Sequence, residues 1–258
     1  MVSFDKMTIK EIDFYLKQCS SLSPVEEEML NNDERNGAKK LLQRYYKCKE
    51  DQEKEKVRLK KMLEKEEQLW RQGYELIAGV DEAGRGPLAG PVVAAAVILK
   101  KATVIERLND SKQLPALLRE KLFEEIVIEA QSYGLGSATQ EEIDRLNIHA
   151  ASMLAMRRAL AALNLQPDYV LVDGFAINSC SIPQKALKSG DRLSLSIAAA
   201  SVLAKVTRDR MMLKIHQKYP HYGFDRNMRY GTEEHRSALL QYGPCPEHRR
   251  SFHCKKKS

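Results

Sequence analysis

No run of apolar residues in this 258-residue chain is long enough to cross a bilayer, although 43% of its residues are hydrophobic. A membrane-spanning helix needs about 20 such residues in succession, so we expect no membrane partner. The N-terminal segment carries acids early and lacks the apolar stretch of a secretory signal. Both features favour a cytoplasmic protein.

Cysteine is also scarce. The five cysteines are an odd number and are widely spaced, which argues against a disulfide framework and is typical of a reducing compartment. Near the C-terminus, four residues are of the types that bind zinc: Cys245, His248, His253 and Cys254. The adjacent pair at 253 and 254 does not fit the spacing of a common zinc finger, so a structural zinc is disfavoured.

Excess positive charge is missing from most of the chain and is confined to its last quarter. Residues 201–258 hold 13 basic and 5 acidic residues, whereas residues 1–75 hold 16 of each. A basic segment of this kind is typical of a protein with a polyanionic partner. We therefore expect residues 205–250 to contact nucleic acid.

Two regions of different composition meet near residue 72. The first predicts helices without a strong core, and its last part, residues 41–70, is heavily charged. The thin apolar stripe there is interrupted by Glu66, which is typical of a surface or bridging helix. We expect a helical N-terminal extension over residues 1–72 and a second domain over residues 73–258.

The second region alternates apolar runs with helical patterns, which predicts an α/β fold with a mixed sheet and helices on its faces. A turn rich in Gly and Pro joins the first two strands and favours an antiparallel pair. Strands are expected at 76–81, 92–99, 132–137 and 169–172. Helices are expected at 116–130, 143–163, 193–219 and, in the basic C-terminal region, 232–242.

Four acids stand out by position: Asp81, Glu82, Asp173 and Asp191. Asp81 and Asp173 each follow an apolar strand, so parallel pairing would bring both to the carboxyl edge of the sheet, where such folds bind ligands. Asp191 precedes the long helix and could reach the same point, with Asp209 as its rival for the fourth place. Oxygen donors without His or Cys favour Mg²⁺ or Mn²⁺, and two such ions can assist phosphodiester cleavage.

The adjacent acids Asp81 and Glu82 present a difficulty. Consecutive side chains of a regular strand point to opposite faces, so both cannot face one cation from such a strand. Either the strand ends or twists at Glu82, as Gly84 and Gly86 would permit, or one acid acts through its backbone or a water.

The turn that follows, Gly84–Arg85–Gly86, lies in the segment GVDEAGRGPLAGP (79–91). Glycine has no Cβ, so this backbone can approach a ligand closely, and the guanidinium of Arg85 suits phosphate. The segment therefore predicts a metal site beside a clamp for a phosphate backbone.

This segment resembles the first motif of the ribonuclease HII family, whose members nick nucleic acid at ribonucleotides paired with DNA. The resemblance extends over roughly residues 76–252 and implies the ribonuclease H-like fold. Six further segments resemble family motifs in family order: 108–114 (LNDSKQL), 168–175 (DYVLVDGF), 190–191 (GD), 197–209 (IAAASVLAKVTRD), 229–235 (RYGTEEH) and 247–252 (EHRRSF).

The resemblance assigns roles to individual residues. It implies that the four acids are catalytic and hold the metal ions, and that the Gly84–Gly86 turn recognises the 2′-hydroxyl at an RNA–DNA junction. Lys112 corresponds to a phosphate contact and Tyr230 to an aromatic residue that stacks on the sugar beside the scissile bond. Arg229 departs from the family, where Gly usually precedes this tyrosine, and could add a phosphate contact or shift the ring.

The function implied is a monomeric endonuclease that uses two Mn²⁺ or Mg²⁺ ions. It would cut the RNA strand of RNA–DNA hybrids, and duplex DNA 5′ to single embedded ribonucleotides, leaving 3′-OH and 5′-phosphate ends. One alternative is the related ribonuclease HIII, against which the intact turn and the helical N-terminal region argue. Another is a non-catalytic nucleic-acid-binding protein, in which acids would only repel phosphate.

Overall fold

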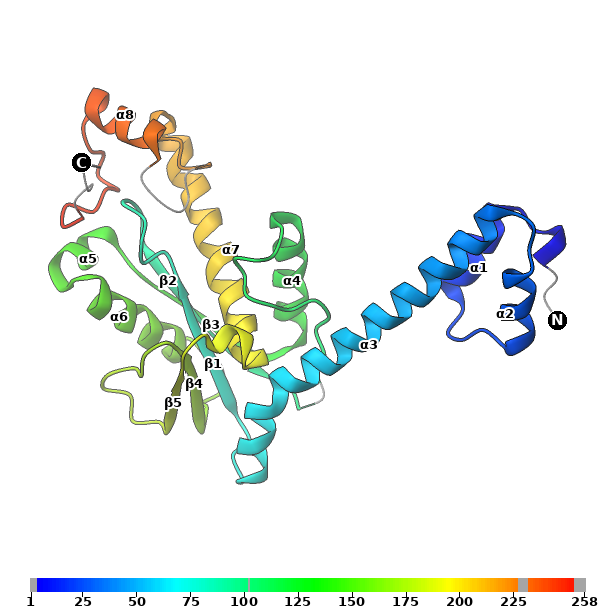
Figure 1. Ribbon diagram of the computed structural model, residues 1–258. Coiled ribbons are helices and arrows are strands. Elements are labelled where there is room, and N and C mark those ends of the chain that lie inside the picture. The colour runs from blue at the N-terminus through cyan, green and yellow to red at the C-terminus, as the bar shows by residue number, and fades with distance from the viewer. Residues whose placement is uncertain (1–3, 102, 227–231, 253–258) are drawn as a thin grey trace. The chain divides into compact units, whose positions relative to one another are not determined.

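The computed structural model describes residues 4–101, 103–226 and 232–252 of the chain (Figure 1). Its internal contacts define two compact units, residues 1–58 and 59–258. This division falls inside helix α3 (Asn36–Arg71). The domain boundary at residue 72, inferred from composition, coincides instead with the end of that helix and stays a prediction. No helix in the described ranges is long and apolar enough to cross a membrane.

The N-terminal unit is built from helices that close around a core of their own. A 3₁₀ turn (Phe4–Lys6), α1 (Ile9–Gln18) and α2 (Pro24–Asn31) precede α3, and capping boxes start both α1 and α2. The expectation that this region lacks a strong core was wrong, because each helix contributes apolar side chains to one cluster. Its buried members are Phe4, Ile12, Leu16, Leu30, Ala38, Leu42 and Tyr45.

The second unit contains a five-stranded mixed sheet with strand order β3-β2-β1-β4-β5. Its strands are β1 (Ile77–Ala83), β2 (Val92–Leu99), β3 (Ala130–Ala138), β4 (Tyr169–Asp173) and β5 (Gln184–Leu187). The first three pair antiparallel, whereas β4 pairs parallel with both β1 and β5. The predicted mixed sheet is confirmed, except that the short and largely polar β5 was not foreseen.

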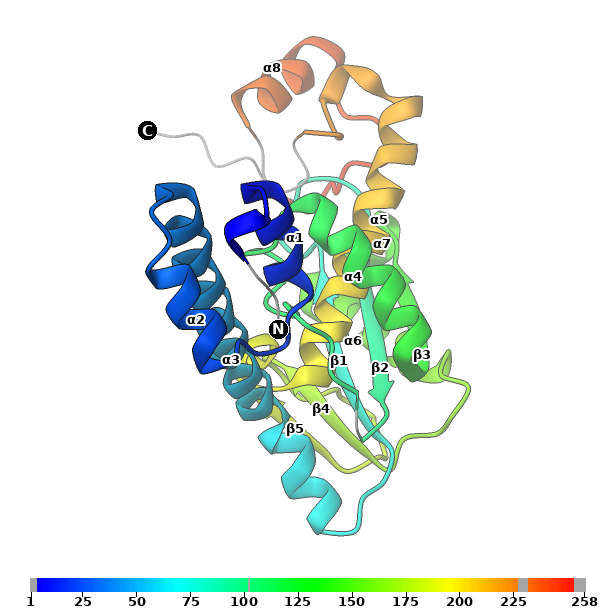
Figure 2. The ribbon, with the colours of Figure 1, turned by 90° about the vertical axis from the view of Figure 1, so that its right-hand side faces the viewer.

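Helices cover both faces of this sheet. Helices α4 (Ala116–Glu129) and α7 (Leu195–Lys218) lie on one side, and α5 (Gln140–Leu146) and α6 (Ile148–Ala161) lie on the other (Figures 1 and 2). The alternation of β2 explains how one strand serves both layers. Ala95 and Val97 pack with α7, whereas Ala94 and Ala96 pack with α6.

Small residues let α7 lie very close to β1. A Cβ at Gly79 would stand 2.1 Å from the backbone carbon of Ser196, so only glycine fits there. The start of α7 is rich in Ala and Ser, whose small side chains also allow such close packing.

The last part of α3 is built into the second unit. Leu59 and Met62 pack in the cluster of α7, and Leu69 packs against Ile77 of β1 and Ile197 of α7. The expectation of a surface or bridging helix was therefore wrong for this part of α3, because its thin apolar stripe is buried.

The helix predicted over residues 143–163 is two helices. Asn147 ends α5 with φ of +71° and starts α6, where its side chain accepts a hydrogen bond from the amide of Ala150. Asparagine tolerates this left-handed conformation better than most residues. The chain closes with a 3₁₀ turn (Pro220–Tyr222) and α8 (Glu233–Tyr242), which confirms a helical C-terminal region.

Candidate active site

The sheet brings two of the predicted acids to the same edge. Val80 of β1 pairs in parallel register with Val172 of β4, so the residues that follow, Asp81 and Asp173, lie side by side at the carboxyl edge. Both line a cavity of about 300 Å³, together with Glu82. The predicted parallel pairing of these strands is confirmed.

Strand β1 does not end at Glu82, as one of the expected solutions required, but runs to Ala83. Asp81 instead turns along the strand, because its Oδ1 accepts the amide hydrogen of Glu82 at 2.6 Å. Glu82 Oε1 accepts a hydrogen bond from Arg85 at 3.1 Å, and its buried Oε2 has no partner among the described residues. Both carboxylates thereby reach one cavity from consecutive positions.

The carboxyl groups of Asp81 and Glu82 are buried close to each other and to Asp173. Burial raises the pKa of Asp81 well above its usual range, and the charges of Glu82 and Asp173 raise it further. Burial also raises the pKa of Glu82, which Arg85 partly offsets. Carboxylates arranged in this way favour a bound cation, because a positive charge between them relieves both effects.

A 3₁₀ turn (Gly190–Arg192) brings Asp191 close to Asp173. The amide of Gly190 donates to Asp173 Oδ1 at 2.6 Å. Asp191 is 5% exposed, and burial, followed by the charges of Asp110 and Asp173, raises its pKa to about 6. The structure therefore places Asp191 within electrostatic reach of Asp173, although it does not line the cavity.

Asp209, the rival for the fourth place, lies in a different setting. Its carboxylate pairs with Lys205 and lies 3.8 Å from Arg119, not with the arginines on either side of it in the sequence. It does not line the cavity either. The choice of Asp191 as the fourth acid stays a prediction.

The predicted Gly84–Arg85–Gly86 turn forms another wall of the same cavity. Gly84 has φ of +100°, and a Cβ there would stand 2.1 Å from Arg208 Nε. Glycine is therefore required both by the backbone conformation and by the arginine packed beneath it.

Two buried arginines hold this turn from behind. Arg249 donates from Nη2 to the carbonyl of Gly84 (2.6 Å), from Nη1 to that of Arg85 (3.0 Å) and from Nε to that of Gly90 (2.9 Å). Arg208 donates to the carbonyls of Ala89 and Pro91. The C-terminal tail that carries Arg249 is itself paired with this loop through Ala89 and His248. Sequence reasoning assigned no role to either arginine.

This arrangement sets the direction of two amides. In a trans peptide the carbonyl and the following N–H point in opposite directions, and the described chain has no cis bond. Because Arg249 holds the carbonyls of Gly84 and Arg85, the amides of Arg85 and Gly86 point away from it. Neither amide has an acceptor within the described residues, so both are available to a ligand in the cavity.

Basic residues complete the cavity wall. Lys112, the predicted phosphate contact, lines it and lowers the pKa of Glu82. Lys205, which was not predicted, lines it from α7 and is buried, and this burial lowers its pKa. Ser201 lies beside Asp81 and is hydrogen-bonded to Ser111 at 2.9 Å. Tyr230 and Arg229 lie outside the described residues.

The donor set fits divalent cations by its chemistry. Among the described residues, no three His, Cys, Asp or Glu side chains have the spacing of a metal site. All four candidate ligands offer oxygen, the donor that Mg²⁺ and Mn²⁺ prefer.

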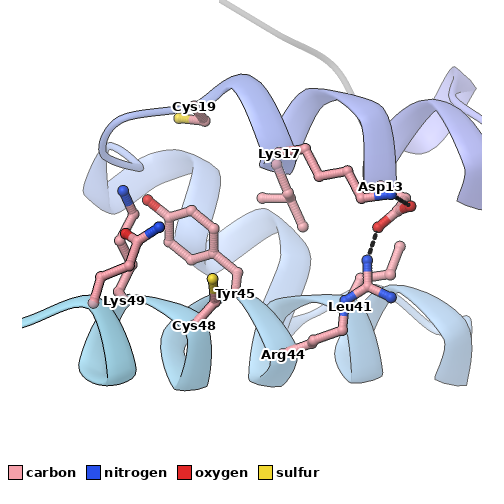
Figure 3. Close-up of a pocket in the computed structure, with 10 residues that line it drawn as sticks. Asp13, Lys17, Cys19, Leu41, Arg44, Tyr45, Cys48 and Lys49 are labelled. Carbon is pink, nitrogen blue, oxygen red and sulfur yellow. Dashed lines mark hydrogen bonds and ion pairs between the residues drawn. The ribbon is translucent and has the colours of Figure 1, made fainter. Parts of the chain in front are cut away.

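A second cavity, of about 350 Å³, lies within the N-terminal unit between α1 and α3 (Figure 3). It is lined by Lys17, Arg44 and Lys49, but Asp13 already pairs with Lys17 at 2.7 Å and with Arg44. None of the predicted site residues lies there, so the chemistry belongs to the cavity at the sheet edge.

Comparisons with known proteins show which family the chain belongs to. The sequence profile described as Ribonuclease HII matches residues 78–255, and that of the Ribonuclease HII N-terminal domain matches residues 8–70. The chain is 48% identical to the Ribonuclease HII of Desulfitobacterium hafniense over 254 residues, which are 98% of this chain and 96% of that protein. It is also 48% identical to that of Geobacillus thermodenitrificans, over 95% of this chain and 94% of the relative.

The fold has a counterpart among solved structures. The crystal structure of ribonuclease H2 from Pyrococcus horikoshii OT3 matches with a TM-score of 0.59 and 29% identity, over 68% of this chain and 93% of that one. Both matching profiles describe ribonuclease HII, so the ribonuclease HIII and non-catalytic alternatives lose their support. The chain therefore belongs to the ribonuclease HII family, and it is an endoribonuclease of the ribonuclease H type.

Proposed function

We propose that this enzyme cuts the RNA strand of RNA–DNA hybrids and cuts duplex DNA 5′ to a single embedded ribonucleotide, leaving 3′-OH and 5′-phosphate ends. The observation that supports this best is one cavity with two unlike walls. Buried carboxylates form one wall, and the Gly84–Gly86 turn with two unoccupied amides forms the other. A phosphodiester beside a ribose offers groups that suit both walls.

On the acidic wall, we propose that Asp81, Glu82, Asp173 and Asp191 hold two divalent cations, Mn²⁺ or Mg²⁺. When bound, such ions activate a water and stabilise the leaving oxygen. The protein's own part is to hold the carboxylates in position. Arg85 donates to Glu82 Oε1, and the amide of Gly190 donates to Asp173 Oδ1.

On the wall formed by the turn, the amides of Arg85 and Gly86 would donate to the 2′-hydroxyl, the group that distinguishes ribose from deoxyribose. Glycines on both sides of Arg85 leave room for the sugar to come close. Lys112 and Lys205 would contact the phosphate backbone, as basic side chains do in nucleic-acid complexes. Stacking of Tyr230 on the sugar stays a prediction, as does the influence of Arg229.

The test uses three matched duplexes: one with a single ribonucleotide, one with an all-RNA strand and one of DNA alone. Each is incubated with Mn²⁺, with Mg²⁺ or with a chelator, and the ends are mapped. We expect a single cut 5′ to the lone ribonucleotide, cuts along the RNA strand, no cut in DNA, and no reaction with the chelator. Equal cleavage of the all-DNA duplex would refute the role of the turn.

We further propose that the enzyme acts as a monomer in the cytoplasm. The odd number and wide spacing of the cysteines favour a reducing compartment. Light scattering coupled to size-exclusion chromatography should give a mass near 29.4 kDa. A mass of twice that value at micromolar protein would contradict the monomer.

A further inference from the structure

Glu66 is a buried carboxylate that the catalytic chemistry does not use. It lies on the last part of α3 and is 3% exposed. Its neighbours on that helix, Met62 and Leu69, belong to apolar clusters. A carboxylate in such surroundings is unfavourable unless specific donors compensate it, and its contacts therefore indicate its role.

The donors all come from the start of α7. Glu66 Oε1 accepts hydrogen bonds from Ser194 Oγ (2.6 Å), from Ser196 Oγ (2.7 Å) and from the amide of Ser196 (3.0 Å). Ser194 is the N-cap of α7, and its own side chain accepts from the amide of Ile197. Glu66 thus caps the same helix a second time from another helix, where an anion also interacts favourably with the helix dipole.

Short hydrogen bonds connect this cap to the acidic wall. The amide of Ser194 donates to the carbonyl of Gly190 at 2.9 Å, and the amide of Gly190 donates to Asp173 Oδ1 at 2.6 Å. Asp191 directly follows Gly190. A Cβ at Gly190 would stand 2.7 Å from Ile197 Cδ1 of α7, so the turn packs closely against this helix.

We infer that Glu66 is a positioning residue for the metal-binding acids. By holding Ser194 and Ser196, it fixes the turn at Gly190 and thereby sets the places of Asp173 and Asp191. This inference rests on the proposed function, in which those two acids hold divalent cations. It makes a residue of the helix that precedes the catalytic sheet part of the support of the active site.

If Glu66 served only to cap α7, its carboxyl group would not be needed. Ser194 alone already caps α7, and an apolar side chain would suit the surroundings of Glu66 better than a carboxylate. Its second oxygen, Oε2, is buried and has no hydrogen-bond partner among the described residues. A carboxyl group kept in this setting is better explained by the geometry that it imposes on Ser194 and Ser196 than by stability alone.

The test compares Glu66→Ala, Glu66→Gln and the wild type in the full chain. Direct Mn²⁺ binding is followed by calorimetry and by the electron paramagnetic resonance of free Mn²⁺. The kcat and KM are measured on a duplex with one ribonucleotide. Glu64→Ala is the matched control, because it makes the same change at an exposed position of the same helix.

We expect Glu66→Ala to weaken Mn²⁺ binding and to lower kcat by roughly 10- to 100-fold, the usual effect of losing a residue that orients metal ligands. The KM for the duplex should stay unchanged, because Glu66 does not touch substrate. Glu66→Gln retains an oxygen acceptor and should recover part of both losses. Glu64→Ala should behave as the wild type.

Wild-type Mn²⁺ affinity and kcat in folded Glu66→Ala, with only a lower melting temperature, would overturn the inference and leave Glu66 a structural cap. Should that variant not fold, wild-type Mn²⁺ affinity in Glu66→Gln and in Ser196→Ala would overturn it equally. Asp173→Asn separates this outcome from a failure of the proposed function. If that variant also bound Mn²⁺ as the wild type does, the metal site itself would be wrongly placed.

Discussion

The two walls of the active-site cavity use buried charge in opposite ways. On the acidic wall, Asp81 and Glu82 face each other's charge, and Glu82 Oε2 has no partner among the described residues. On the turn wall, Arg249 places its donors on three backbone carbonyls. The buried carboxylates of one wall repel each other, whereas the buried guanidinium on the other is matched to backbone carbonyls.

The two walls thus show two different effects of a charged side chain that is buried away from water. Buried charges of the same sign lower stability but create affinity for a cation. Charge matched to carbonyls shapes the backbone, so that the amides of Arg85 and Gly86 point away from Arg249. Substitutions on the two walls should therefore change stability with opposite sign, even though both lower activity.

The largest effect is expected on the acidic wall. Asp81→Asn or Asp173→Asn should lower single-turnover cleavage by about 1000-fold or more, because metal-ion catalysis is worth several kcal/mol. Duplex binding should persist or tighten, since one negative charge is removed. Without metal, Asp81→Asn should unfold at a higher urea concentration than the wild type, because repulsion is relieved. Substantial turnover in either variant would contradict the assignment of these acids.

A smaller effect is expected on the turn wall. Arg249→Ala leaves three carbonyls without their donor and should lower the free energy of unfolding by about 2–4 kcal/mol. Misplaced amides should lower cleavage at a lone ribonucleotide by roughly 10- to 100-fold. Arg249→Lys should recover little, because an ammonium cannot span three carbonyls as a planar guanidinium does.

The neighbouring Arg250 supplies the matched control for that substitution. Its side chain is exposed, and its backbone amide donates to Asp144 at 2.9 Å. Arg250→Ala should leave stability and the preference for ribonucleotides unchanged. An equal loss in both variants would mean that Arg249 acts through general charge rather than through the turn.

The smallest effect for each unit of change concerns pH. His248 lies in the tail that carries Arg249, where its Nδ1 accepts the amide of Cys245 and its Nε2 lies 3.2 Å from His235 Nε2. Burial, followed by the charge of His235, lowers the pKa of His248 to about 4. Below pH 6.5 the unfolded chain binds a proton that the folded one does not. The free energy of unfolding should therefore fall by about 1 kcal/mol per pH unit between pH 6.5 and 4.

Asp191 should titrate with the opposite sign over a similar range. Its pKa is raised to about 6, so the folded metal-free protein binds a proton that the unfolded chain does not, and its contribution is lost as pH rises towards 6. Urea unfolding from pH 7 to 4.5 is therefore compared between the wild type, His248→Gln and Asp191→Asn. His248→Gln should remove the destabilisation at low pH. Parallel pH profiles for all three proteins would contradict both assignments.

Local patterns predicted much of this molecule. Strand β2 matches the expected range 92–99 at both ends, because an apolar run between turn residues describes a buried strand well. The acids Asp81 and Asp173 were placed together because each follows a strand, and parallel pairing of β1 and β4 then determines where they lie. Features that depend on residues close together in the chain, such as a strand and the acid at its end, could be predicted from the sequence.

The features that could not be predicted depend on contacts between residues far apart in the chain. Glu66 was interpreted as an interruption of a surface stripe, because Ser194 and Ser196 lie 128 and 130 residues away. Arg249 bonds to carbonyls 159 to 165 residues away. In both cases only the folded chain supplies donors or acceptors that make a buried charge acceptable, so periodicity carries no sign of them.

Helix α3 is one continuous helix, but its two parts contribute side chains to two different hydrophobic cores. Tyr45 belongs to the first core, whereas Leu59 and Met62 belong to the second. Consider a chimaera in which residues up to 72 come from a relative and the rest from this chain. The relative's residue would then take the place of Glu66, while Ser194 and Ser196 would remain those of this chain. A crossover at residue 58 would cut through a helix yet transfer each core whole. For recombination between family members, the compatible junction therefore lies in the middle of a helix and not in the loop after it.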